Sequence, residues 1–128
     1  MLLDSNVVIA IMRESESVIA TLNRHRSGEI FVSSLVLSEL YFGAFKSNRS
    51  VIALADVDAL DFQVLNFNRH DARMAGNIRY SLGKAGTPIS PLDTLIAGQA
   101  LARDLTLVTR NIREFARVDG LRVENWEV

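Results

Sequence analysis

The chain has 128 residues, of which 48% are apolar and 23% are charged, the balance of an ordinary single globular domain. It contains no cysteine, which excludes disulfides, thiol nucleophiles and cysteine metal sites and is compatible with a reducing cytoplasm. The formal net charge of -1 argues against strong nonspecific attraction to nucleic acid, so an RNA partner would need basic residues that are concentrated locally.

Membrane and export signals are not expected. No uninterrupted apolar run approaches the roughly 20 residues that a membrane helix needs. The charge of Asp4 comes after only three residues, which leaves no room for the apolar region of a signal peptide. We therefore expect a single cytoplasmic domain over residues 1–128, without membrane association.

Short β-like runs alternate with helical periodicity along the chain. The predicted strands are residues 1–3, 29–32, 62–65 and 105–108, with a candidate fifth at 121–124. The predicted helices are residues 5–12, 15–26, 34–47, 50–60, 69–85 and 91–103. Short strands separated by helices of about ten residues or more require crossover connections. The pattern therefore predicts an α/β fold with a mainly parallel sheet.

Asp4 directly follows the first predicted strand. In an open parallel α/β sheet, ligands bind outside the carboxyl ends of the strands, so this carboxylate should face the binding crevice. Asp is also a common cap at the start of a helix, and a helix is predicted from residue 5. Both interpretations remain open for Asp4 when it is considered alone.

Glu39 lies in the middle of an apolar helical stripe. At 3.6 residues per turn, its neighbours on the helix surface include Leu35, Val36 and Phe42. A charge on such a face points to the core or to a cleft, where an unpaired ion is costly. A metal ion would supply the missing partner, and an ion pair with Lys46, two turns away, is the alternative. We favour the metal-ligand interpretation.

Asp93 lies in the first turn of an apolar, and therefore buried, predicted helix. Ser90 and Asp93 have the spacing of a capping box, and Pro91 suits the first helical position. A carboxylate in the first turn of a buried helix can act both in the cap and as a metal ligand, so the two roles coexist. Asn111 follows the fourth predicted strand and could bind metal or water, although capping of a short helix at 112–115 is the better interpretation.

Three carboxylates without clustered His or Cys favour a hard cation, Mg²⁺ or Mn²⁺, over Zn²⁺. Such a cation can hold a phosphodiester by its oxygen atoms and activate a bound water. Polar side chains near the ends of the predicted strands could orient the acids, although each also suits a cap or a turn. These supporting candidates are Ser5, Asn6, Ser34, Thr109 and Asn111.

Basic residues near predicted strand ends and loops are candidates for contacts with an RNA backbone, although solvation is the default for each. They are Arg13, Lys46, Arg49, Arg79, Lys84, Arg110 and Arg113.

Four segments together resemble a known family. They are LDSN (3–6), SSLVLSELYFGA (33–44), PLDTLIA (91–97) and LVTRN (107–111) with EF at 114–115. In this order and spacing they resemble the PIN domain, and more narrowly the VapC-type toxins of bacterial toxin–antitoxin pairs. The closing GL (120–121) and ENW (124–126) are similar to the tail of that subgroup.

This resemblance implies a three-layer α/β/α fold with a central parallel sheet of 4–5 short strands and Mg²⁺- or Mn²⁺-dependent cleavage of RNA, often a structured RNA such as tRNA. It also implies homodimers, inhibition by a small VapB-like antitoxin, and contact with operator DNA only through that antitoxin. Asp4, Glu39 and Asp93 match the three family acids, while many relatives have a fourth Asp where this chain has Asn111. That departure leaves a second metal site open.

Three other functions compete with the toxin hypothesis. The chain could be a PIN nuclease that processes RNA or acts on DNA. It could be an α/β signalling or phosphoryl-transfer domain, but such domains need a second Asp beside the first or a Lys after a late strand, and Asp4-Ser5-Asn6 and Thr109-Arg110 offer neither. Finally, it could be a noncatalytic binding module whose acids serve only as caps and in ion pairs.

Overall fold

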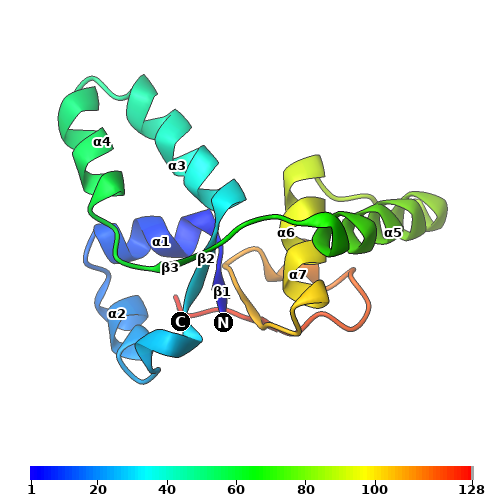
Figure 1. Cartoon of the computed structure of the whole chain (residues 1–128). Coiled ribbons are helices and arrows are strands. Elements are labelled where there is room, and N and C mark those ends of the chain that lie inside the picture. Colours follow the sequence, from blue (N-terminus) through cyan, green and yellow to red (C-terminus); the bar gives the residue numbers. More distant parts are fainter. Residues whose placement is uncertain (128) are drawn as a thin grey trace.

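The computed structural model describes residues 1–127 and has a five-stranded sheet at its centre (Figure 1). The strands are β1 (Leu2–Leu3), β2 (Phe31–Ser33), β3 (Gln63–Leu65), β4 (Leu107–Val108) and β5 (Val123–Glu124), in the order β3-β2-β1-β4-β5. Every pairing is parallel, with Leu2 opposite Phe31 on one side and opposite Leu107 on the other. The predicted parallel sheet is confirmed, including its fifth strand. The expected single domain extends to Val128, which lies outside the described residues.

Helices connect the strands and flank the sheet. They are α1 (Ser5–Met12), α2 (Glu16–Leu22), α3 (Ser34–Lys46), α4 (Ser50–Asp58), α5 (Arg69–Ala85), α6 (Pro91–Ala102) and α7 (Ile112–Phe115). Figure 1 shows α1 to α4 on one side of the sheet and α5 to α7 on the other. The predicted three-layer α/β/α architecture is therefore confirmed. Among residues 1–127, no helix is both long enough and apolar enough to cross a membrane.

The boundaries match the predicted ones closely, except around residues 23–30. The helix predicted over 15–26 ends at Leu22, a 3-10 turn covers Ser27–Glu29, and β2 begins only at Phe31. The reason is that 23–29 is a polar run containing Gly28, without an apolar face to pack against the sheet. This correction does not affect the carboxyl end of β2, where α3 begins.

The core is densest around β1 and α6. Leu2 and Leu3 are fully buried because β1 has neighbouring strands on both edges and helices on both faces. Gly98 in α6 packs directly on α5, since a Cβ at this position would lie 2.6 Å from the backbone of Ala75. Only a glycine permits this separation of the two helices.

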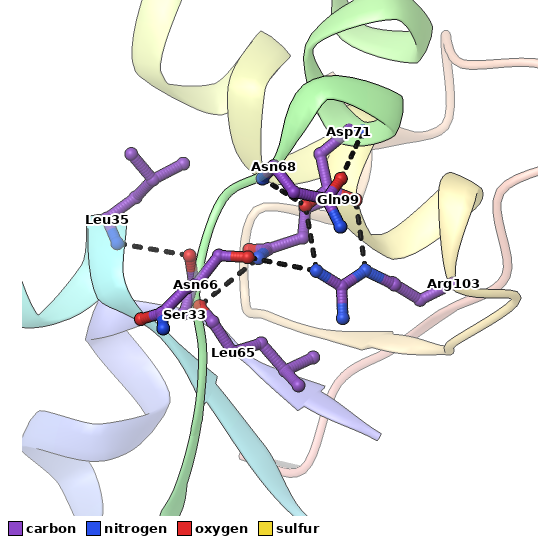
Figure 2. A network of polar contacts seen from close by, with 8 residues as sticks. All are labelled: Ser33, Leu35, Leu65, Asn66, Asn68, Asp71, Gln99 and Arg103. Atoms are coloured by element: carbon purple, nitrogen blue, oxygen red, sulfur yellow. Dashed lines mark hydrogen bonds and ion pairs between the residues drawn. The ribbon is translucent and has the colours of Figure 1, made fainter.

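A buried ion pair ties α5 to α6 (Figure 2). Asn68 and Asp71 form a reciprocal capping box at the start of α5, and the Asp71 side chain is fully buried. Arg103, just after α6, donates from Nε and Nη2 to the two oxygens of Asp71, each at 3.0 Å. Gln99 donates to the main-chain oxygen of Leu65 at 3.2 Å, which joins α6 to the end of β3. The position of α6 is thus held from its C-terminal end.

Candidate active site

Asp4 is held at the carboxyl end of the central strand. Its backbone N–H donates to the Val108 carbonyl at 2.9 Å and so extends the pairing of β1 with β4. Its side chain is buried, and Oδ1 caps α1 by accepting from the Ser5 N–H at 2.8 Å. The predicted cap is therefore confirmed. Oδ2 faces a different set of donors, so capping occupies only one of the two carboxylate oxygens.

Thr109 and Asn6 orient that second oxygen. The fully buried Thr109 hydroxyl donates to Asp4 Oδ2 at 2.8 Å, and the Asn6 amide donates to the same oxygen at 3.2 Å. Asn6 also donates to Thr109 Oγ1 at 3.3 Å and accepts from the Arg110 N–H at 3.2 Å. Residues from the ends of β1 and β4 are thereby linked into one polar network, as expected for supporting residues at a strand edge.

Glu39 enters the same region from α3. Burial raises the pKa of Glu39, and the nearby charges of Asp4 and Asp93 raise it further. A hydrogen bond with the Ser5 side chain offsets part of this rise. Glu39 therefore faces other acids, whose charges make its own ionisation costly.

The alternative partner of Glu39, Lys46, does not pair with it. The Lys46 ammonium lies 5.1 Å from the centre of the Phe42 ring, and none of the ion pairs within residues 1–127 involves Glu39. The ion-pair explanation for a charge on this apolar face is therefore wrong.

Asp93 lies in the first turn of α6. The Ser90 hydroxyl accepts from the Asp93 N–H at 3.2 Å, which is one half of the predicted capping box. Burial raises the pKa of Asp93 to about 6, against an opposing hydrogen bond with Ser90. The charges of Asp4 and Glu114 contribute to the rise. Asp93 is thus both part of a helix cap and a member of the acid cluster.

Glu114 is a fourth acid that the sequence analysis did not single out. It lies on α7, close enough to Asp93 for its side chain and its charge to raise the pKa of Asp93. The buried Phe115 beside it anchors α7 and so fixes Glu114 at the carboxyl edge. In the sequence, Glu114 was marked only by its place in the EF motif at 114–115, next to Phe115.

The donor set fits a hard divalent cation. Asp4, Glu39 and Asp93 offer carboxylate oxygens, no histidine contacts them, and no Lys or Arg of residues 1–127 forms an ion pair with them. Within those residues, no three acidic or histidine side chains are already close enough to hold a metal ion. A cation would have to draw the carboxylates inwards, and it would relieve the repulsion that adds to the effect of burial on the pKa values of Glu39 and Asp93.

Two of the predicted supporting residues, Asn111 and Ser34, make no hydrogen bond to the acids. Asn111 is the N-cap residue of α7, as predicted, although its side chain makes no capping hydrogen bond. It lines a cavity together with Ser5, Asn6 and Arg110. Ser34 is the first residue of α3, whose cap is the neighbouring Ser33.

The basic residues predicted to contact RNA lie in different parts of the molecule. Arg110 lies beside the acid cluster, through the contact of its backbone with Asn6. Lys46 and Lys84 lie over the rings of Phe42 and Tyr80. Arg49 precedes α4, and Arg79 is an exposed residue of α5.

A five-stranded parallel sheet, with one acid directly after β1 and others on α3 and α6 at its carboxyl edge, defines the class of protein. The family model for the PIN domain matches residues 1–121, and the chain belongs to that family. The resemblance inferred from the four motifs is therefore confirmed.

Within this family, the relatives are VapC proteins. The chain is 36% identical to the tRNA(fMet)-specific endonuclease VapC of Shigella flexneri, over 98% of this chain and 96% of that protein. It is similar in structure to VapBC of Salmonella typhimurium bound to DNA, with a TM-score of 0.91, 37% identity and coverage of 98% and 96%. A third likeness is to VapBC2 of Rickettsia felis bound to a DNA fragment from its promoter, with a TM-score of 0.91, 31% identity and coverage of 98% and 97%.

Proposed function

We propose that this chain is a Mg²⁺- or Mn²⁺-dependent endoribonuclease and the toxin of a toxin–antitoxin pair. The observation that carries the proposal is the grouping of Asp4, Glu39 and Asp93: burial and the charge of Asp4 raise the pKa values of Glu39 and Asp93, and none of the three acids forms an ion pair with a basic residue among residues 1–127. Further support comes from VapC relatives that are named as ribonucleases and that align over nearly the whole chain.

The chain's own residues would divide the work. Asp4, Glu39 and Asp93 would hold the cation, which lowers the pKa of a bound water and stabilises negative charge on the phosphate and the leaving oxygen. Thr109 and Asn6 keep Asp4 Oδ2 oriented through hydrogen bonds of 2.8 and 3.2 Å. Glu114 adds a further carboxyl group beside Asp93.

The substrate we propose is a structured RNA, such as tRNA. A relative that is 36% identical is named as a tRNA(fMet)-specific endonuclease, which makes tRNA the first substrate to test. The activity would then take place in the cytoplasm, with residues 1–128 acting as one PIN domain.

We further propose a VapB-like antitoxin as partner. Relatives of this chain were solved as VapBC complexes, two of them bound to DNA. We infer that this chain would contact operator DNA only through its antitoxin, and that it forms a homodimer.

The test compares Glu39→Gln with the wild-type protein on total bacterial tRNA in Mg²⁺ and in Mn²⁺. The substitution is nearly isosteric but removes the charge, so cleavage should fall at least ~100-fold while far-ultraviolet CD stays unchanged. EDTA should stop wild-type cleavage, and added Mn²⁺ should restore it.

A matched control is Glu16→Gln, which removes an exposed acid in the first turn of α2 and should leave cleavage intact. If Glu39→Gln cleaves as fast as this control, Glu39 has no part in the reaction. Cleavage of DNA but not RNA by the wild-type protein would instead favour the other type of PIN nuclease.

A further inference from the structure

RNA must approach an edge of the molecule that is rich in negative charge. Four acids gather there, in a chain whose formal net charge is only -1. A bound divalent cation would offset part of this charge, but each further nucleotide brings another phosphate. Single-stranded nucleic acid is normally held by basic side chains that track its backbone. The basic residues beside the acid cluster therefore decide how RNA can lie on it.

Two arginines line a cavity next to the cluster. The cavity has a volume of about 580 Å³ and lies between α1 and the segment that follows β4. Ser5 and Asn6 line it together with Arg13 and Arg110. Its volume lies within the ~300–1,000 Å³ of typical small-ligand sites. A phosphate group with parts of its flanking nucleotides would therefore fit.

The position of Arg110 is coupled to that of Asp4. The Arg110 backbone N–H donates to Asn6 Oδ1, and the amide nitrogen of the same Asn6 donates to Asp4 Oδ2. One asparagine side chain thus fixes the spacing between a proposed metal ligand and a guanidinium-bearing residue. Because the contact uses the Arg110 backbone, replacing its side chain should leave this framework in place.

Arg13 stands at the border of two cavities. It caps the C-terminal end of α1, with its backbone N–H donating to the Ile9 carbonyl at 2.9 Å. It lines the first cavity and also a second one of about 530 Å³, which is walled by α1, α3 and α4 and includes Glu39. Ser5, which follows Asp4 in the chain, lines both. Arg13 is therefore near both the acid cluster and the cavity of Arg110.

Neither guanidinium is neutralised by an acid within residues 1–127. In that part of the chain, Arg103 pairs with Asp71 and Arg122 with Asp104, whereas no ion pair involves Arg13 or Arg110. Both side chains are exposed and remain available to an anion. Glu127 lines the same cavity without an ion pair to either arginine, so its charge should weaken anion binding there.

We propose that Arg13 and Arg110 form a subsite for an RNA backbone phosphate next to the bond that is cleaved. The inference rests on the proposed nuclease function and assigns the path of the substrate past Asn6 and α1. Guanidinium groups suit this role because their donors match the oxygens of a phosphate.

The test measures binding of fluorescently labelled tRNA by anisotropy in EDTA, where metal-dependent cleavage cannot occur. The double variant Arg13→Ala/Arg110→Ala should bind at least ~10-fold more weakly than wild type. The slope of log K against log salt should become shallower by about 0.7, because one phosphate contact is lost. The double variant with Lys at both positions should recover most of the salt slope, which a merely structural role would not predict.

Arg24→Ala is the matched control. Arg24 is exposed and lies next to Asn23 and His25, which line a cavity at the opposite, amino end of β2 and β3. Its removal takes away the same charge and should leave affinity and slope unchanged. Glu127→Gln should bind RNA more tightly than wild type.

Equal affinity and salt slope for the double Ala variant and Arg24→Ala would overturn the subsite, as would a wild-type protein that binds no RNA. The proposed nuclease function fails separately. If the wild-type protein binds RNA with the expected salt slope but cleaves none in Mg²⁺ or Mn²⁺, the subsite stands and the nuclease function does not.

Discussion

Two groups of sequestered acids in this molecule have opposite electrostatics. Burial acts to raise the pKa of Asp71, but hydrogen bonds from Arg103 and from the Asn68 backbone outweigh it, and the net pKa is lowered. At the carboxyl edge, burial raises the pKa values of Glu39 and Asp93, and neighbouring acids raise them further. The first group has a basic partner built into the fold, while no Lys or Arg of residues 1–127 forms an ion pair with the second.

The difference separates a stabilising contact from a binding site. Asp71 is ionised at no great cost, because Arg103 and the start of α5 supply donors to both of its oxygens. The edge acids are held in a cluster that costs free energy until a cation arrives. A sequence that keeps such a cluster trades some stability of the metal-free protein for affinity towards the ion.

The largest effect on stability is expected when the ion pair between Asp71 and Arg103 is broken. Arg103→Ala would leave Asp71 fully buried without its cation, which should lower the free energy of unfolding by ~3 kcal/mol. Urea denaturation followed by CD measures this. Arg122→Ala breaks the exposed pair with Asp104 and should change stability little. A similar, small loss in both variants would show that the buried pair is not a principal support of the fold.

A smaller effect should follow from loosening the support of the edge acids. Thr109→Val keeps the shape of the side chain but removes the hydroxyl that donates to Asp4 Oδ2. Outer-shell changes of this kind typically weaken metal binding or activity by ~10–100-fold, and we expect Mn²⁺ affinity to fall by that factor. Calorimetric titration with Mn²⁺ gives the affinity directly. Thr21→Val, on the exposed part of α2, is the control, and equal affinities for the two variants would rule out an orienting role for Thr109.

The smallest effect is on the pH dependence of stability without metal. The folded-state pKa of Asp93 is raised from 3.8 to about 6, so folding favours its protonated form. Its contribution is therefore fully present below pH 3.8 and is lost as pH rises through about 6.

Asp71 has the opposite sign, because its lowered pKa gives stability that is present above its unfolded value and lost in stronger acid. Metal-free Asp93→Asn should therefore show a weaker fall in unfolding free energy between pH 4 and about 6 than the wild-type protein. Parallel stability curves for the two proteins, measured in EDTA, would contradict this assignment.

The site residues that could be predicted from the sequence are those whose surroundings are determined by their neighbours in the chain. Asp4 was recognised because it ends a buried strand, and Glu39 because its own helical neighbours are apolar. Helix boundaries could also be predicted from local sequence patterns. The helix predicted over 15–26 was too long, and it ends at Leu22, where the apolar pattern stops.

The residues that were missed depend on partners far away in the chain. Asp71 was not singled out from the sequence, since no neighbouring residue indicates its pairing with Arg103, 32 positions later. Glu114 was not singled out either, since no residue near it in the sequence indicates a partner. Its contact with Asp93 is set by how α7 packs beside α6, which local sequence patterns do not encode.

The contact between Gly98 and Ala75 limits how this sequence can change over evolutionary time. Position 98 lies midway along α6 between Asp93 and Arg103, and any side chain there would collide with the backbone of α5. A substitution would push α5 and α6 apart. This would displace both Asp93, the proposed metal ligand at one end of α6, and Arg103, which pairs with Asp71 at the other end. We therefore expect position 98 to tolerate no residue other than glycine, although it belongs to neither the proposed metal site nor the proposed RNA subsite.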